Sequence, residues 1–182
     1  MYAKASAFAG VSRGDRLAGQ YTVEIDARRA SGVEGSLGIL LGIADDWSEF
    51  YTFEVYPDLQ VGAIFRNLNG HWTLMSYASS GAIMPGQFTN RLRVETSTAA
   101  GHTAYFYING AYISSLAIPY APSAARRVGL TASADGAGFD ARFDNYKVVP
   151  EGCPASFTTS QSGMSDARPF HEASRDIQLD TR

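Results

Sequence analysis

Apolar and polar residues alternate in short segments along most of residues 20–149. In residues 21–27 (YTVEIDA), every second side chain is apolar, so the apolar side chains share one face of a strand and the acidic ones share the other. Residues 37–43 (LGILLGI) are almost continuously apolar, as expected of a central strand covered on both faces. No segment before Pro150 keeps a helical period of apolar positions, so the pattern predicts an all-β protein.

Turn residues divide the remaining segments into hairpins. Residues 48–77 predict three short strands folded back on one another, with turns at Pro57 and at the Asn-Gly pair that begins with Asn69. A second Asn-Gly pair, beginning with Asn109, favours another two-residue hairpin, and residues 13–15 (RGD) are expected to form a turn. About eleven short strands in sequence predict a sandwich or a barrel. We expect them at residues 2–11, 21–27, 37–43, 91–96, 103–108, 112–118, 127–132 and 139–149, with three more inside 48–77.

The composition divides the chain into two parts. Residues 1–150 form the predicted globular domain, which is long enough to bury a core. Residues 151–182 are rich in Ser, Thr, Gln, Asp and Arg, so we interpret them as a polar C-terminal tail or linker. The alternative is that the tail docks as an added strand, for which residues 176–180 (DIQLD) are the candidate.

Charge and composition argue against several classes of partner. A net charge of -3 at pH 7 gives no electrostatic attraction to nucleic acid. No apolar run approaches the ~20 residues of a membrane-spanning helix. Cys153 is the only cysteine, so no disulfide forms within the chain, and the first residues lack the apolar region of a signal peptide. Composition leaves open whether the chain is cytoplasmic or a module of a larger exported protein.

Three groups of short motifs cover most of residues 20–149. They are residues 21–29 (YTVEIDARR), 50–55 (FYTFEV) with 70–74 (GHWTL), and 90–94 (NRLRV) with 107–110 (YING) and 143–148 (FDNYKV). In their order and spacing, these motifs together resemble the concanavalin A-like lectin and glucanase superfamily. More narrowly, they resemble bacterial modules related to laminin-G-like and 3-keto-disaccharide-hydrolase-like domains.

This resemblance implies a jelly-roll sandwich of two antiparallel sheets, one of them concave. It implies a sugar-binding or adhesive module of a larger exported protein, and therefore an extracellular or cell-surface location; a minority of such domains are glycosidases. Modules of this kind open with an acidic and aromatic strand that is absent or divergent in this chain. We therefore expect an unpaired sheet edge, which the tail or a neighbouring chain fills.

The candidate catalytic patterns have simpler interpretations. Glu24 and Asp26 resemble the paired acids of sandwich-fold glucanases, since alternate residues of a strand point to one face. The glucanase motif continues with a further acid where this chain has Arg28, so we interpret the pair as a charged, solvated strand face. Residues 10–14 (GVSRG) match a nucleophile elbow, but no helix is predicted after them, which favours a turn. The three histidines have no zinc-ligand spacing.

Aromatic side chains are the main candidates for binding, because sugar rings stack their C–H faces on flat rings while polar neighbours hydrogen-bond the hydroxyl groups. Trp47, in a loop, is the ring that we most expect to be exposed. Trp72 follows a hairpin turn, where a place in the core fits the sequence equally well. Of the strand that holds Tyr105 and Tyr107, one face has to be core. The predicted ligand-binding residues are Trp47, Tyr56, Arg66, Trp72, Tyr105 and Tyr107, with Tyr112 as a further candidate ring.

Asp144 is the predicted metal ligand. The resemblance implies a structural calcium ion near the end of the closing strand, and carboxylate oxygens are the ligands that calcium prefers. The alternative is that Asp144 and Asn145 only hydrogen-bond the turn beside them.

Three functional hypotheses follow from the sequence. The first is a non-catalytic, lectin-like module that binds a carbohydrate or a protein surface, with no nucleic acid partner and no membrane span. The second is a structural or assembly subunit that forms oligomers through its tail. The third and weakest is a glycoside hydrolase.

Overall fold

A computed structural model describes residues 6–32, 34–99, 101–121, 123–135, 140–151 and 167–169. These residues form strands and one short 3-10 helix, Pro57–Leu59, and in this part of the chain no helix is long and apolar enough to cross a membrane. The strands are β1 (Ser6–Leu17), β2 (Tyr21–Ser31), β3 (Gly35–Ile43), β4 (Glu49–Tyr56), β5 (Val61–Leu68), β6 (His71–Ser79), β7 (Asn90–Ser97), β8 (Thr103–Ile108), β9 (Ala111–Ala117), β10 (Arg126–Asp135), β11 (Asp140–Pro150) and β12 (Ala167–Pro169).

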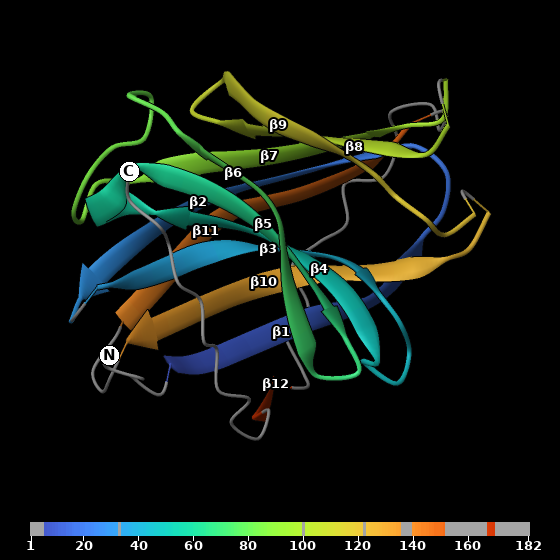
Figure 1. Ribbon diagram of the computed structural model, residues 1–182, viewed down its shortest axis with the longest axis horizontal. Coiled ribbons are helices and arrows are strands. Elements are labelled where there is room, and N and C mark those ends of the chain that lie inside the picture. The colour runs from blue at the N-terminus through green and yellow to red at the C-terminus, as the bar shows by residue number, and fades with distance from the viewer. Residues whose placement is uncertain are drawn as a thin grey trace.

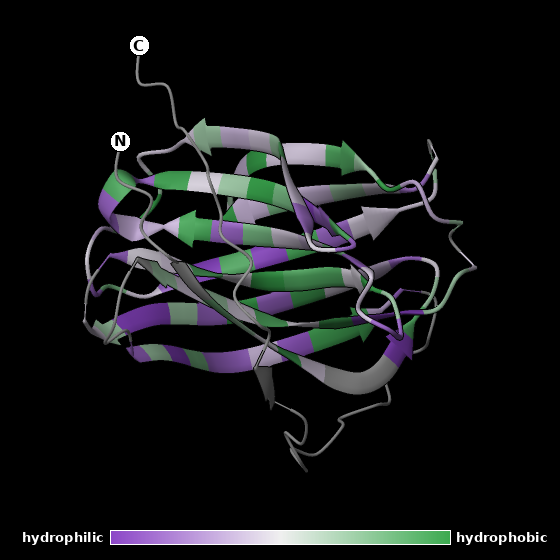
Figure 2. Ribbon diagram, turned by 60° about the horizontal axis from the view of Figure 1, so that its bottom comes forward, coloured by the Kyte–Doolittle hydropathy of each residue, from purple (hydrophilic) through white to green (hydrophobic). Residues whose placement is uncertain are grey.

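The strands form two antiparallel sheets that pack face to face. One sheet has seven strands in the order β12-β1-β10-β3-β4-β5-β6, and the other has five in the order β11-β2-β7-β8-β9. Figure 1 shows the two layers, with β7, β8 and β9 in the upper part of the view and β1 and β10 in the lower part. Hydrophilic and hydrophobic residues alternate in bands along many strands in Figure 2. The predicted all-β sandwich is confirmed.

The main core lies between the sheets and comes from the inward positions of each alternating strand. In β2, the inward residues Tyr21, Val23 and Ile25 are buried, as the alternation predicted. The rings of Phe53 on β4 and Phe106 on β8 meet across the two layers, with their centroids 5.0 Å apart. Both rings are fully buried, so this pair joins the two sheets through apolar packing.

A second apolar cluster lies on the outer face of the seven-stranded sheet. It contains the buried Leu40 and Phe50, against which the partly buried Phe8 and Trp72 pack. The Phe8 and Trp72 centroids are 5.1 Å apart, although Phe8 lies on β1 and Trp72 on β6. In a flat sheet these strands would be roughly 24 Å apart, at about 4.8 Å for each strand spacing. The sheet is therefore strongly curled, which agrees with the predicted concave sheet.

The expected turn at residues 13–15 is wrong, because this segment belongs to β1. The pairing of β1 with β10 shifts its register between Ser12 and Arg16. Such a β-bulge lets a strand accommodate extra residues without ending. Arg13, Gly14 and Asp15 therefore interrupt the pairing but do not reverse the chain.

The edge of β1 is paired within the same chain. In β12, Pro169 lies opposite Ala9 and Ala167 lies opposite Val11, so residues 167–169 form the outermost strand of the seven-stranded sheet. Residues 176–180, which the sequence suggested as the added strand, lie outside the described residues, as do residues 2–5 of the first predicted strand.

Candidate functional site

Two rows of outward-facing side chains cross the five-stranded sheet. In β8, Ala104, Phe106 and Ile108 are buried in the core, so Tyr105 and Tyr107 face outward. Tyr107 pairs with Arg93 on β7 and with Tyr112 on β9, and Tyr105 pairs with Glu95 on β7. We call this surface the tyrosine face; it consists of Arg93, Glu95, Tyr105, Tyr107 and Tyr112.

Contacts between neighbouring strands hold the tyrosine face in place. The Arg93 guanidinium carbon lies 4.2 Å from the centroid of the Tyr107 ring, within the range of a cation–π contact. Arg93 also donates a hydrogen bond from Nη1 to Oε1 of Glu95. The Tyr112 ring meets Tyr107 edge to face at 5.8 Å and remains 57% exposed. The surface therefore combines an exposed ring with a positioned cation and carboxylate.

The protonation of Tyr107 suits a hydrogen-bonding role. Partial burial raises the pKa of its phenol, and the negative charge of Glu95 raises it further. Because the ordinary pKa of tyrosine is already about 10, the hydroxyl stays protonated across the physiological range. Tyr107 is thus a neutral group that can donate or accept a hydrogen bond.

The acidic pair beside this surface is neutralised. Arg91 Nε donates to Asp26 Oδ1 at 2.7 Å and Arg91 Nη2 donates to Asp26 Oδ2 at 3.1 Å, while Glu24 Oε1 lies 3.6 Å from Arg91 Nε. Asn145 Nδ2 also donates to Asp26 Oδ2, at 2.7 Å. The hydrogen bond from Arg91 is the main cause that lowers the pKa of Asp26. A general acid needs the opposite shift, so this geometry favours the interpretation as a charged strand face.

Asp144 lies on β11 at a shift in the pairing with β2. Its Oδ1 accepts the backbone N–H of Asn145 at 2.8 Å, and Asn145 has a left-handed φ of 55°. These contacts match the local hydrogen bonding that was the alternative to a metal site. No three His, Cys, Asp or Glu side chains gather as metal ligands within the described residues. Calcium binding at Asp144 stays a prediction.

Three of the predicted binding rings lie at the outer face of the curled sheet instead. The Trp72 ring meets Phe50 at 5.4 Å, and the Trp47 ring meets the same Phe50 at 6.0 Å. Trp47, at a positive φ of 62°, also lies under the guanidinium of Arg127, 5.3 Å away. Both tryptophans are only partly exposed, so they help to cover the second apolar cluster. Tyr56 lies on the same face and donates its O–H to Glu54 Oε2 at 3.0 Å.

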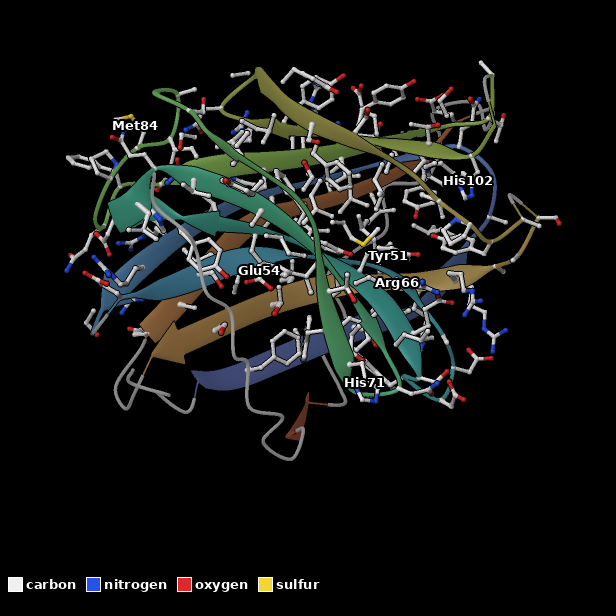
Figure 3. All side chains as sticks on the ribbon, in the orientation of Figure 1. Tyr51, Glu54, Arg66, His71, Met84 and His102 are labelled. Carbon is white, nitrogen blue, oxygen red and sulfur yellow. The ribbon has the colours of Figure 1, made fainter. Side chains whose placement is uncertain are left out.

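Glu54 is a polar residue whose environment the alternation along β4 did not reveal. Its carboxylate is 0% exposed and also accepts a hydrogen bond from Ser36 Oγ at 2.6 Å. Figure 3 labels Glu54 in the middle of the molecule. A polar residue facing outward from a strand predicts a solvated side chain, but the curl of this sheet buries it. Because a buried carboxylate is costly without hydrogen bonds, Ser36 and Tyr56 support it directly.

Arg66 lies apart from the tyrosine face. It donates to Glu49 Oε1 from Nε at 3.1 Å and from Nη2 at 2.7 Å, and this hydrogen bonding raises its pKa above the ordinary value. Its guanidinium carbon is 6.0 Å from the Tyr51 ring, and Figure 3 shows the two residues side by side. Of the six predicted ligand-binding residues, only Tyr105 and Tyr107 therefore lie on the tyrosine face. Tyr112, the further candidate ring, lies there as well.

Solved structures of low sequence identity share this fold. Carbohydrate binding module CBM66 from Bacillus subtilis matches with a TM-score of 0.59 and 15% identity, over 81% of this chain and 84% of that one. The potassium-bound carbohydrate recognition domain of Emp46p matches with a TM-score of 0.57 and 11% identity, over 80% and 88%. Sheep galectin-11, in a complex with glycerol, matches with a TM-score of 0.54 and 15% identity, over 78% and 96%.

Sequence comparisons add no closer relationship. No protein-family model matches the chain, and no curated protein matches it in sequence. The structural matches confirm the predicted concanavalin A-like jelly-roll fold, because they cover most of this chain and most of each neighbour. At these identities, the likeness concerns the fold.

Proposed function

We propose that the chain is a non-catalytic, lectin-like module that binds a glycan through the tyrosine face. The observation that carries this proposal is the placement of Arg93 over Tyr107, next to the exposed ring of Tyr112. Neighbours of the same fold are named as a carbohydrate-binding module and as a carbohydrate recognition domain, which supports the ligand class.

The chemistry of the tyrosine face suits a sugar. The Tyr112 ring offers an apolar surface for the C–H groups of a pyranose or furanose ring. Arg93 offers N–H donors and Glu95 offers acceptors for the hydroxyl groups of the sugar. Because these side chains already hold one another, binding loses less conformational entropy than it would with free side chains.

A binding role accounts for the acidic pair better than hydrolysis does. Glycosidases use two carboxyl groups, one of which must give up a proton near neutral pH. The ion pair of Asp26 with Arg91 keeps that carboxylate ionised, and Glu24 lies near the same arginine. A solvated binding surface tolerates such an ion pair without loss. We further propose that the module acts outside the cell or at its surface.

A glycan array with the full-length chain, with and without calcium, tests the ligand class. Solution titration calorimetry on the best glycan then compares Tyr107→Ala and Tyr112→Ala with the unmodified chain. Loss of one stacking ring, worth about 0.5–1.5 kcal/mol, is expected to weaken binding roughly two- to twelvefold. Phe88→Ala is the matched control, since this ring is exposed in the loop between β6 and β7.

The array and the variants separate the alternatives. Binding that Tyr107→Ala and Tyr112→Ala leave unchanged would move the site to another face, with Trp72→Phe as the next variant to examine. An array with no signal in either buffer would overturn the glycan proposal. Hydrolysis of a bound glycan that disappears in Glu24→Gln would overturn the non-catalytic assignment.

A further inference from the structure

The chain contains two Asn-Gly pairs, and the structure places both at the same kind of turn. Asn69 and Gly70 join β5 to β6, and Asn109 and Gly110 join β8 to β9. The two asparagines have φ values of 52° and 50°, and both glycines have a φ of 84°. These left-handed angles are those of the two-residue hairpin turn that Asn-Gly favours. The two turns therefore differ in their surroundings and not in their sequence or backbone shape.

An asparagine that precedes glycine is open to attack by the backbone nitrogen of that glycine, because glycine has no side chain to hinder the approach. A β-carbon on Gly70 or on Gly110 would have no atom within 4 Å, so the space around both glycines is open. Asn69 and Asn109 are also both exposed. Access of water and local crowding therefore do not separate the two sites.

The carboxamide of Asn109 is held by three hydrogen bonds. Its Nδ2 donates to Ala82 O at 2.7 Å and to Asn90 Oδ1 at 2.8 Å. Its Oδ1 accepts the backbone N–H of Arg91 at 2.8 Å. Asn90 is itself fully buried, so this partner is firmly placed. The carboxamide of Asn109 therefore has to lose these hydrogen bonds before its Cγ can meet the nitrogen of the next residue.

The carboxamide of Asn69 is not held in this way. The backbone N–H of Asn69 donates to Ser48 O at 2.6 Å, but its side chain makes no hydrogen bond among the described residues. One hydrogen bond does oppose opening of this turn, since Gly70 N–H donates to Asn67 Oδ1 at 3.1 Å. The backbone N–H of Asn109 is bonded as well, at 2.8 Å. Opening the Asn109 turn therefore breaks two more hydrogen bonds than opening the Asn69 turn.

We propose that Asn69 is a site of spontaneous deamidation and that the fold protects Asn109 from the same reaction. The backbone nitrogen of Gly70 loses its proton to the solvent and attacks Cγ of Asn69, which forms a new C–N bond. The bond from Cγ to Nδ2 then breaks, and ammonia leaves with a proton from the solvent, so that a succinimide ring remains. Water opens this ring at either carbonyl carbon and gives aspartate or isoaspartate. The reaction consumes one water and releases one ammonia.

Either product changes the turn between β5 and β6. Both products carry a carboxylate, which adds a negative charge to a chain whose net charge is -3. Isoaspartate also carries the main chain through the former side chain, which lengthens the backbone of the turn. The turn belongs to the seven-stranded sheet, whereas the tyrosine face lies on the five-stranded sheet, so the reaction does not depend on glycan binding.

Mass spectrometry of the full-length chain tests the proposal. The folded chain is kept at mildly alkaline pH and digested at intervals, and the peptides that contain Asn69 and Asn109 are followed, because exchange of the NH2 group for OH raises the peptide mass. Fragmentation of each peptide locates the change. We expect Asn69 to react at least about four times faster than Asn109, since each of the two additional hydrogen bonds slows the reaction roughly two- to twelvefold. Equal rates, or a faster reaction at Asn109, would overturn the proposal.

The same chain in concentrated urea is the control for the effect of the fold. Both turns are then absent, so we expect the two Asn-Gly pairs to react at similar rates. A preference for Asn69 that is as large in urea as in the folded chain would show that local sequence causes it, and would overturn protection by the fold. A folded chain in which Asn69 does not react, although it reacts in urea, would overturn the proposed site.

Asn90→Ala tests the protection of Asn109 directly, because it removes one acceptor of the Asn109 carboxamide and none of the contacts of Asn69. We expect Asn109 to react roughly two- to twelvefold faster in this variant, with the rate at Asn69 unchanged. Gln87→Ala, at an exposed residue of the same loop between β6 and β7, is the matched control and should change neither rate. Circular dichroism shows whether Asn90→Ala is folded; if it is not, the comparison of the unmodified chain with and without urea decides. An unchanged rate at Asn109 in folded Asn90→Ala would contradict protection by these hydrogen bonds.

Discussion

Arg91 on β7 donates two parallel hydrogen bonds, of 2.7 Å and 3.1 Å, to the carboxylate of Asp26 on β2. This bidentate pair joins two neighbouring strands of the five-stranded sheet, opposite each other in the register. It also decides the chemistry of the acidic strand face, because a carboxylate held in this way stays ionised at neutral pH.

The Asp26 pair predicts a specific pH dependence of stability. The folded-state pKa of Asp26 lies below its ordinary value of about 3.8. The ionised Asp26 therefore stabilises the fold fully above that pH, and this stabilisation is lost as the pH falls toward the folded-state pKa. We expect the unfolding free energy of Arg91→Met to change less with pH below about 4 than that of the unmodified chain. Urea unfolding between pH 2.5 and 6 (roughly the window of carboxylate titration) measures this dependence.

Arg16→Met is the control for this prediction, since Arg16 lies on β1 in the other sheet and pairs with Asp45 at an exposed position. The same pH dependence in the Arg91 and Arg16 variants would show that the Asp26 pair contributes nothing distinct. Direct NMR titration of Asp26 should show its pKa rising in Arg91→Met.

Phe106→Ala is expected to be strongly destabilising. This ring is fully buried and contacts Phe53 in the opposite sheet, so its removal leaves a cavity between the two layers. Truncation of a buried Phe costs about 3–5 kcal/mol of unfolding free energy. Phe88→Ala, at a ring that is 63% exposed, should change it by less than about 0.5 kcal/mol. Urea unfolding of both variants at pH 7 provides the comparison, and equal losses would be inconsistent with the packing described.

Glu54→Ala tests the buried carboxylate of the curled sheet. The change removes the carboxylate that accepts hydrogen bonds from the Ser36 and Tyr56 hydroxyl groups, and loss of the acceptor of a buried donor such as Ser36 costs about 1–3 kcal/mol. We expect Glu54→Gln, which keeps an acceptor oxygen, to be the milder of the two variants. Glu34→Ala, at an exposed position, serves as the surface control in the same unfolding experiment. Equal stability of Glu54→Ala and Glu34→Ala would argue that the two hydrogen bonds contribute little.

Phe8→Ala should open the outer face of the curled sheet around Trp72. The two rings are in direct contact, so removing Phe8 exposes the indole to water. In a Trp47→Phe background, Trp72 is the only tryptophan, and its fluorescence is expected to shift to longer wavelength. Phe88→Ala in the same background should leave the emission unchanged. A spectrum that Phe8→Ala does not alter would show that Trp72 is covered independently of this contact.

Local alternation was enough to predict which residues of the straight strands are buried. Tyr21, Val23 and Ile25 are buried on β2, and residues 35–43 form a central strand with nearly every side chain inside. These assignments hold because the side chains of a strand point alternately to its two faces, whatever the rest of the chain does. Residues 13–15 were mispredicted because a glycine between polar residues has the same composition in a bulge as in a turn.

The sites were harder to predict, because contacts between strands distant in the sequence decide them. The sequence offered Tyr105 and Tyr107 as candidates. Nothing in it showed that Arg93 lies over Tyr107 or that Glu54 is buried at the outer face of the curled sheet. Trp72 had two interpretations, and its contacts with Phe8 and Phe50 give it a packing role.

By itself, the sequence determined an all-β sandwich and the faces of its regular strands. The tertiary structure alone decided that the seven-stranded sheet curls until Phe8 touches Trp72, and that Arg93 lies over Tyr107. The physical reason is that alternation is a property of each strand, whereas pairing order and sheet curvature depend on the simultaneous packing of all strands.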